Sequence, residues 1–251
     1  EAIVYRALLD LADTGATVAV VSGNHDNAQR LRAVAPLLER GRVHLLTEPR
    51  RPADGGVRRL RLRSGEDLSL AMLPFVSQRG IVRAEHLMAD AAFEHAQLYA
   101  DRLRGLIDRL CQELEPDLPA LLVTHAFVFG GQVGGGERMA HLATEYAVVT
   151  QSFPATVGYV ALGHLHRAQK LPGATAIHYC GSPLQLDFGE VNEAKQVNLV
   201  DLVAGKPAKV TPVELKAGSR LFTLSGTVTQ IADAAGAIPE TAWIRARVDE
   251  P

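Results

Sequence analysis

The stretch that most constrains the fold is residues 157–166, Val-Gly-Tyr-Val-Ala-Leu-Gly-His-Leu-His. Its first six residues are mostly apolar, which predicts a strand covered on both faces, as in the parallel sheets of α/β proteins. His164 and His166 follow directly, and Gly163 is expected to provide the backbone bend that aims both imidazoles at one point. Imidazole is the commonest side-chain ligand of transition metals. This stretch alone is equally compatible with a metal site and with two loop histidines in water.

A second apolar run, residues 17–21, opens into Ser-Gly-Asn24-His25-Asp26. Asn27 then stands where a side chain can cap the start of a helix. The order of strand, polar loop and helix is the repeating unit of a layered α/β fold.

A third apolar run, residues 120–124, delivers His125 at its end. Adjacent parallel strands place their carboxyl ends on one rim of a sheet, so three such strand ends are expected to gather there. Nitrogen and amide-oxygen donors without thiolates favour Mn, Fe, Zn or Ni over a structural zinc.

Composition places the chain among ordinary globular proteins. It has 251 residues, of which 47% are apolar and 22% charged, enough for one large domain or two unequal ones. The net charge of −2 does not indicate a nucleic-acid binder by bulk electrostatics. No apolar run is long enough for a membrane span, and no signal peptide is evident. Cys111 and Cys180 have no metal-type spacing, so we expect packed core thiols in a reducing cytosol.

Other segments predict the remaining elements. We expect a helix over residues 1–13, and a helix from residue 28 that Pro36 breaks and that restarts until Gly41. A strand is expected over 43–46, and helical structure from about residue 84. An apolar stripe at helical spacing runs along the end of that helical region: Leu103, Leu106, Ile107, Leu110 and Leu114. From residue 194 short alternating strands follow, at 195–202, 209–215, 221–224 and 243–248.

Arginines alternate with leucines at Arg59, Arg61 and Arg63, so one face of this strand is cationic. Such a face can meet phosphates, but charge on a solvated edge strand also prevents aggregation, and we favour the solvated edge. The loop 129–137 contains five glycines and must be mobile or tightly turned. It is either a flexible linker or a loop on the substrate side.

The motifs Gly23-Asn-His-Asp26, the single His125, and Gly163-His-Leu-His166 resemble, in order, the last three motifs of the calcineurin-like metallophosphoesterases. The wider matches at residues 20–26, 159–169 and 179–183 resemble the SbcD-type nuclease subunits within that superfamily. The resemblance covers most of the chain. It implies a sandwich of two sheets flanked by helices, followed by a small β-rich capping domain.

The resemblance also implies roles for residues. Two metals, usually Mn²⁺, would share the site, one held by Asn24, His125 and His164 and the other by His166. His25 would bind no metal and would act on the phosphate as a charge stabiliser or proton donor, while Asp26 orients His25 or its loop. Two cations can clamp a phosphodiester and activate a water between them, and an unligated imidazole can serve as a general acid.

The implied domains are residues 1–190, a nuclease domain, and 191–251, part of a capping and DNA-binding domain. The family's first two motifs are absent, so the chain is expected to be a fragment with an incomplete site and impaired activity. The resemblance implies a cytoplasmic DNA repair and recombination nuclease. Its partners would be DNA and an SbcC-type ATPase, with a homodimer inside a heterotetramer and no membrane.

Two alternatives remain. One is a phosphoesterase of the same superfamily that acts on nucleotides or other small phosphoesters, against which the segment 179–183 and the β-rich region argue. The other is a non-catalytic module that binds DNA or a partner.

Overall fold

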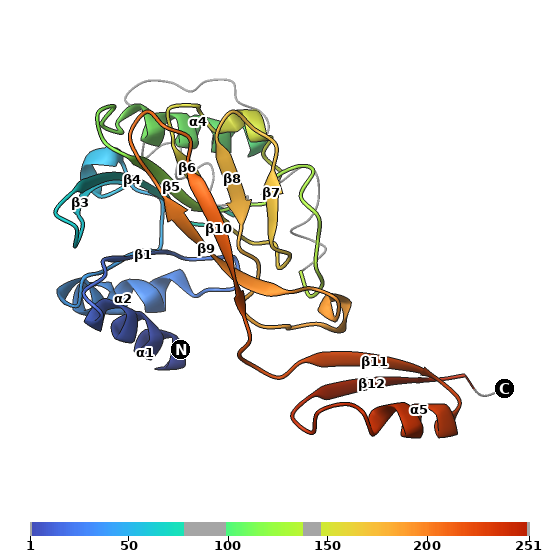
Figure 1. The fold of residues 1–251 in the computed structure, drawn as a ribbon. Helices are drawn as coiled ribbons and strands as arrows, with labels where there is room; N and C mark the ends of the chain where they lie inside the picture. The colour runs from blue at the N-terminus through green and yellow to red at the C-terminus, as the bar shows by residue number, and fades with distance from the viewer. Residues whose placement is uncertain (1, 78–98, 138–146, 250–251) are drawn as a thin grey trace.

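The computed structural model describes residues 2–77, 99–137 and 147–249 (Figure 1). Its elements, in chain order, are α1 (Ala2–Asp13), β1 (Val18–Val21), α2 (Ala28–Arg40), β2 (Val43–Leu46), η1 (Pro52–Asp54), β3 (Val57–Arg61), β4 (Asp67–Leu73), α4 (Tyr99–Gln112), β5 (Ala120–His125), η4 (Thr150–Ser152), β6 (Tyr159–Gly163), β7 (Gln169–Leu171), β8 (Ala176–Tyr179), η5 (Phe188–Glu190), β9 (Lys195–Asp201), β10 (Lys209–Leu215), β11 (Leu221–Gly226), α5 (Val228–Ala235) and β12 (Trp243–Val248).

Two sheets lie face to face at the centre of the molecule. The larger has the strand order β3-β4-β5-β6-β8-β7, with β4, β5, β6 and β8 parallel and the two edge strands antiparallel. The smaller is the parallel pair β1–β2. Apolar side chains from both sheets meet between them, among them Leu46, Leu60, Leu70 and Met72. The predicted two-sheet sandwich is therefore confirmed.

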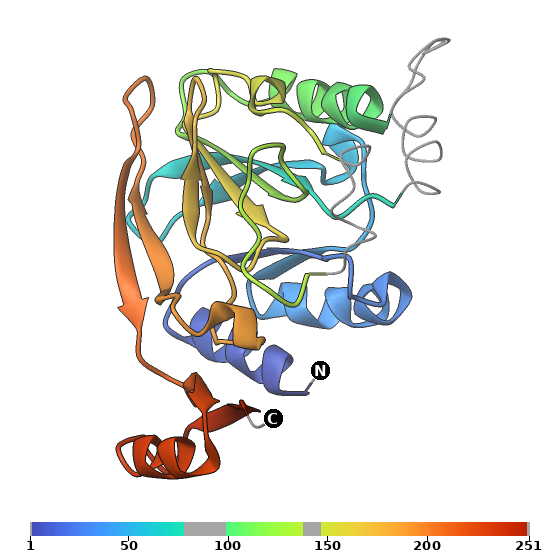
Figure 2. The same cartoon turned by 90° about the vertical axis from the view of Figure 1, so that its right-hand side faces the viewer.

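Helices cover both outer faces of the sandwich (Figures 1 and 2). The outer face of β1–β2 packs on α1 and α2 around Ala12, Leu38 and Val43. The far face of the large sheet packs on α4, whose predicted apolar stripe is buried. The α/β class predicted from the strand pattern is thus confirmed, with the layer order helix, sheet, sheet, helix.

The predicted break at Pro36 is wrong, because α2 continues without interruption from Ala28 to Arg40. A proline inside a helix removes one hydrogen bond, and here the packing of the α2 face that carries Leu38 maintains the helix. The predicted cap is confirmed, since the Asn27 side chain accepts a hydrogen bond from the Arg30 amide at 3.1 Å. The helix expected from residue 84 is described only from Tyr99, and residues 84–98 lie outside the described residues.

The C-terminal strands form two separate pairs. β9 and β10 form an antiparallel hairpin that lies along the large sheet, where Asn198 donates to the Tyr159 hydroxyl at 3.3 Å. β11 and β12 pair in parallel and are joined by α5, which the sequence reasoning missed. A parallel pair needs such a crossover, and the Thr227–Gln230 capping box was the available signal. The domain boundary at residue 190 stays a prediction.

A search of the described helices finds none with the length and apolar character needed to cross a membrane.

The two cysteines are expected to differ in reactivity, contrary to the prediction that both are core thiols. Cys111 is buried, and burial, followed by the charge of Asp108, raises the pKa of its thiol to about 12. Cys180 is only half-buried. In the native protein at pH 8, iodoacetamide should therefore alkylate Cys180 and leave Cys111 unmodified until the chain is unfolded. Peptide mass mapping measures both sites, and equal labelling in the native protein would contradict this.

Candidate metal centre

The site is assembled where β1, β5 and β6 end. His125 is the last residue of β5, and its register partner across the sheet is Gly163, the last residue of β6. His164 follows directly. β1 packs against β5 from the second sheet, so the turn that carries Asn24 lies over the same rim. The three strand ends gather as predicted, but not on the rim of one sheet: β5 and β6 are neighbours in the large sheet, whereas β1 belongs to the small sheet that packs against it.

Three donor atoms lie close together at this rim. Asn24 Oδ1 is 2.8 Å from His125 Nε2, and His164 Nδ1 is 3.4 Å from the same nitrogen. Donors bound to one divalent ion at about 2.0–2.2 Å are separated from one another by roughly 3 Å. The spacing of Asn24, His125 and His164 therefore fits a set of ligands around a single ion.

Two glycines allow the His125 ring to sit at this rim. A Cβ atom on Gly23 would lie 2.6 Å from His125 Cε1, and one on Gly163 would lie 2.7 Å from His125 Nδ1. Real Cβ atoms do not approach another atom so closely. A side chain at either position would therefore displace the imidazole of His125. The glycines of both motifs are therefore required by packing against one histidine.

The backbone bend does not lie where the sequence placed it. Gly163 is not among the residues with positive φ, whereas His164 itself has φ 117°. A non-glycine residue in this region costs of order 1–3 kcal/mol and occurs mostly at functional sites. The prediction that Gly163 provides the bend is wrong; Gly163 provides space for His125, and His164 carries the strain.

Electrostatics keep His125 neutral. Burial, followed by the charges of the neighbouring His164, His25 and His166, lowers its pKa to about 3. A neutral imidazole keeps a lone pair for a metal or hydrogen-bond donor at physiological pH. The His125 imidazole is thereby suited to bind a cation.

Aromatic rings form an apolar wall beside the histidines that sequence reasoning did not anticipate. The Phe75 ring stacks on His164 with centroids 6.4 Å apart and meets His125 edge-on at 6.0 Å. Phe127 lies 6.1 Å from His164. These rings restrict water around the two imidazoles and hold their orientation. No periodic pattern marks Phe75 or Phe127, so the sequence carries no signal for this role.

The loop after β1 is fastened by Asp26, whose carboxylate accepts from the Gly23 amide at 2.7 Å. His25 is exposed at this rim and lies close enough to His125 to influence its pKa. Of the two roles expected for Asp26, the structure supports holding the loop.

His166 is held by residues that the motif analysis missed. Its Nδ1 lies 2.9 Å from Oε1 of the fully buried Glu190. Its backbone amide donates to Glu137 at 2.8 Å, and Glu137 also accepts from the amides of Gly134 and Gly135. The glycine-rich loop is thus tightly turned against His166 rather than extended. Glutamates far from any motif give no sequence signal of such a role.

Arg59, Arg61 and Arg63 are not brought together with the histidines. Arg61 is paired with Asp67 at the start of β4, the end of the sheet opposite to the site. Arg59 lies 2.7 Å from Asp67 and 2.9 Å from Glu115, and Arg63 donates to the Thr14 carbonyl at 3.0 Å. β3 is an edge strand, which agrees with the favoured interpretation of a solvated edge.

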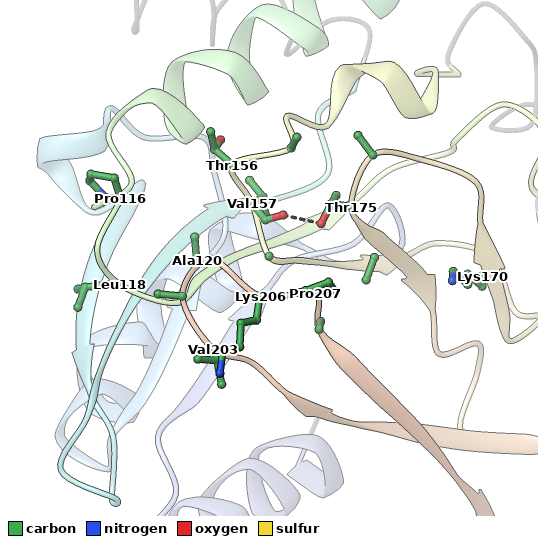
Figure 3. A pocket seen from close by; sticks show the side chains of 17 residues that line it. Pro116, Leu118, Ala120, Thr156, Val157, Lys170, Thr175, Val203, Lys206 and Pro207 are labelled. Atoms are coloured by element: carbon green, nitrogen blue, oxygen red, sulfur yellow. Dashed lines mark hydrogen bonds between the residues drawn. The ribbon is translucent and has the colours of Figure 1, made fainter.

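A cavity of about 590 Å³ lies away from this rim (Figure 3). Its walls come from the amino ends of β5, β6 and β8 and from the turn between β9 and β10, including Ala120, Gly158, Ala176 and Lys206. Because these strands are parallel, the cavity and the histidines lie at opposite ends of the sheet. The cavity carries none of the chemistry described above.

The donor set fits a divalent ion of the transition series. Asn24 supplies a neutral oxygen, and His125 and His164 supply nitrogens, without thiolates. Across residues 2–77, 99–137 and 147–249, no group of three or more His, Cys, Asp and Glu side chains gathers closely enough for an ion. The arrangement therefore depends on the Asn24 amide as the third donor.

Comparison with known proteins finds related chains along most of this sequence. It is 33% identical over 227 residues to the SbcD subunit of the nuclease SbcCD from Bacillus subtilis, a match that covers 88% of this chain and 56% of that protein. It is 32% identical to the protein of the same name from Rhodobacter capsulatus, over 85% and 55% of the two chains. The Escherichia coli K12 protein is 29% identical over 90% and 56%.

The resemblance to SbcD-type nuclease subunits is thereby confirmed, and the chain spans about half the length of these curated relatives. A search of family models gives no match.

The glycine packing predicts a specific loss of stability. Gly163→Ala places a methyl group against the His125 ring and should lower the free energy of unfolding by about 1–3 kcal/mol. The Gly236→Ala control, where the nearest atom is at 3.5 Å and φ is −62°, should change it by less than about 0.5 kcal/mol.

Urea denaturation measures both variants. In a His125→Ala background the ring is gone, so the additional cost of Gly163→Ala should largely disappear. If Gly163→Ala lowers the free energy of unfolding as much in that background as in the wild type, the His125 ring is not the reason that residue 163 must be glycine.

Proposed function

We propose that this chain carries metal-binding residues of an SbcD-type nuclease subunit, and that the subunit hydrolyses DNA phosphodiester bonds with divalent metal ions. The observation that carries the proposal is the cluster of Asn24, His125 and His164 at one sheet rim. It occurs in a chain 33% identical to a protein named as a nuclease subunit. We propose a cytoplasmic assembly with DNA and an SbcC-type ATPase, in which two copies of the subunit pair.

Asn24, His125 and His164 would hold one ion, and His166 would contribute to a second, with Mn²⁺ as the proposed metal. Such ions, when bound, polarise the phosphate and supply a metal-activated water. The neutral amide of Asn24 adds no negative charge, so the ion keeps its strength as a Lewis acid. Phe75 and Phe127 keep bulk water from the imidazoles, which strengthens their interaction with a cation.

His25 is proposed to act on the substrate. It lies exposed at the rim where a phosphodiester would approach, on a loop that Asp26 fastens. An imidazole in that place can hold a proton for the leaving oxygen or stabilise the charge on the phosphate. Substitution of His25 should therefore affect catalysis without affecting metal binding.

Substitutions at the rim should separate metal binding from catalysis in the native subunit. Asn24→Ala removes a metal donor and should weaken Mn²⁺ binding by at least about tenfold. His25→Ala should leave that affinity within about threefold and reduce the rate of DNA cleavage by about 10²–10⁴. Calorimetry with Mn²⁺ and cleavage of an end-labelled duplex measure the two effects.

The control is His178→Ala, a histidine on β8 that stacks on Tyr159 away from the rim and should alter neither property. Equal loss of metal binding in His25→Ala and Asn24→Ala would contradict the assignment. Activity on nucleotide monoesters with none on duplex DNA would favour the small-phosphoester alternative.

Contact between DNA and Arg59, Arg61 and Arg63 is kept as a separate proposal. Each side chain already has a partner in the fold, and Arg59 and Arg61 share Asp67. If they neutralise phosphates, replacing all three with alanine should reduce the slope of log K against log salt by about 0.9 for each lost contact. An unchanged slope in fluorescence anisotropy titrations would assign these arginines to the sheet edge alone.

A further inference from the structure

We propose that Glu190 is a positioning residue that holds a proton on Nδ1 of His166 and so leaves the lone pair of Nε2 available to a metal. The buried Lys195 pairs with the Glu190 carboxylate and holds it in this orientation. The inference deepens the proposed function, because it rests on His166 as a metal ligand, and it concerns residues outside the motifs that carry the resemblance.

The geometry assigns the two carboxylate oxygens different partners. Oε1 of Glu190 faces His166 Nδ1 at 2.9 Å. Oε2 accepts from Lys195 Nζ at 2.7 Å and from the Leu186 amide at 3.2 Å. The Ser182 hydroxyl also lies 3.2 Å from Oε2, but its single hydrogen has a shorter acceptor, the Leu184 carbonyl at 2.8 Å. Two donors on Oε2 satisfy that oxygen, so Oε1 remains to accept a hydrogen bond from the imidazole.

Lys195 ties the ring and the backbone of His166 together. Besides Glu190, its ammonium donates to the His166 carbonyl at 3.2 Å and to the Ser182 hydroxyl at 2.9 Å. The Ser182 amide donates to the same carbonyl at 3.0 Å, and Glu137 accepts from the His166 amide. His166 is therefore held at its ring, its carbonyl and its amide, as a ligand that must keep one orientation requires.

A role in stabilising the fold alone does not account for the buried ion pair of Glu190 and Lys195. Glu190 is 0% and Lys195 7% exposed, and desolvation of such a pair offsets most of its Coulomb attraction, so apolar side chains of similar volume would stabilise the fold as well. A carboxylate beside a histidine does what an apolar residue cannot, since it selects the tautomer of the ring. The hydrogen bonds of Glu190 and Lys195 given above reach the ring and the carbonyl of His166.

Glu190→Gln should reverse the hydrogen bond to the ring. The Lys195 ammonium and the Leu186 amide require the glutamine oxygen at the position of Oε2, which turns the amide NH₂ toward Nδ1 of His166. The ring must then carry its proton on Nε2, and that nitrogen can no longer bind a metal. Glu193→Gln is the matched control, because Glu193 lies 3.7 Å from the same Lys195 and forms its ion pair, at 3.6 Å, with Arg167 and not with the His166 ring.

The experiment is ¹⁵N-histidine NMR of the metal-free native subunit at neutral pH, with the His166 signal assigned through His166→Gln, followed by Mn²⁺ calorimetry. Wild type and Glu193→Gln should show the Nδ1–H tautomer at His166, and Glu190→Gln the Nε2–H tautomer. Mn²⁺ affinity should fall about 10–100-fold in Glu190→Gln and change by less than about twofold in Glu193→Gln.

An Nε2–H tautomer in the wild type overturns the inference, and this result needs no folded variant. An unchanged tautomer in Glu190→Gln overturns it as well, as does equal loss of affinity in both variants. If the tautomer switches while the wild type binds no metal, the positioning role stands and the proposed function fails. The two claims are thus tested separately.

Discussion

The parallel pairing of β5 with β6 is the interaction on which the site depends. Its register sets His125 opposite Gly163, so the first imidazole packs against a residue without a side chain and the next residue, His164, reaches the same point. A slip by one residue would turn every side chain of one strand to the other face of the sheet. It would also place a Leu162 or His164 side chain where the His125 ring now lies. The apolar runs that bury both faces of these strands therefore also fix the positions of the donors.

Burial, more than neighbouring charges, determines the protonation state of His125 at the site. His125 and His164 lie among aromatic and backbone groups, and burial, as the dominant effect, lowers the pKa of His125. The buried carboxylate in contact with a rim imidazole, Glu190, is already paired with Lys195. The rim thus offers the neutral Asn24 amide and the His125 imidazole to a cation while the negative charge of Glu190 is balanced, so an ion held there as proposed would keep its attraction for an anion.

Sequence reasoning reached the parts of the structure that follow from periodicity. Buried strands, the stripe on α4, the Asn27 cap and the convergence at the rim were all predictable, because apolar runs and strand ends have fixed geometric consequences. It was wrong where packing decides between local options, as at Pro36 and in the conformation of Gly163 and His164. Phe75, Glu137, Glu190 and Lys195 were missed because their roles come from contacts between segments, and such contacts leave no local pattern. The capping box before α5 was a signal that was present and overlooked.

The wide spacing of the site along the chain has a consequence for its formation. Asn24 and His125, which are in contact, are 101 residues apart in the sequence. His166 contacts Glu190, which lies 24 residues further along the chain. Contacts of such separation form only after large loops have closed, and a chain emerging from the ribosome folds from its N-terminus. A nascent chain can therefore complete β1 and β2 early, yet Asn24 meets its partners only after β5 and β6 have joined the sandwich. If these residues hold the proposed metal, its acquisition would report that the two sheets have come together.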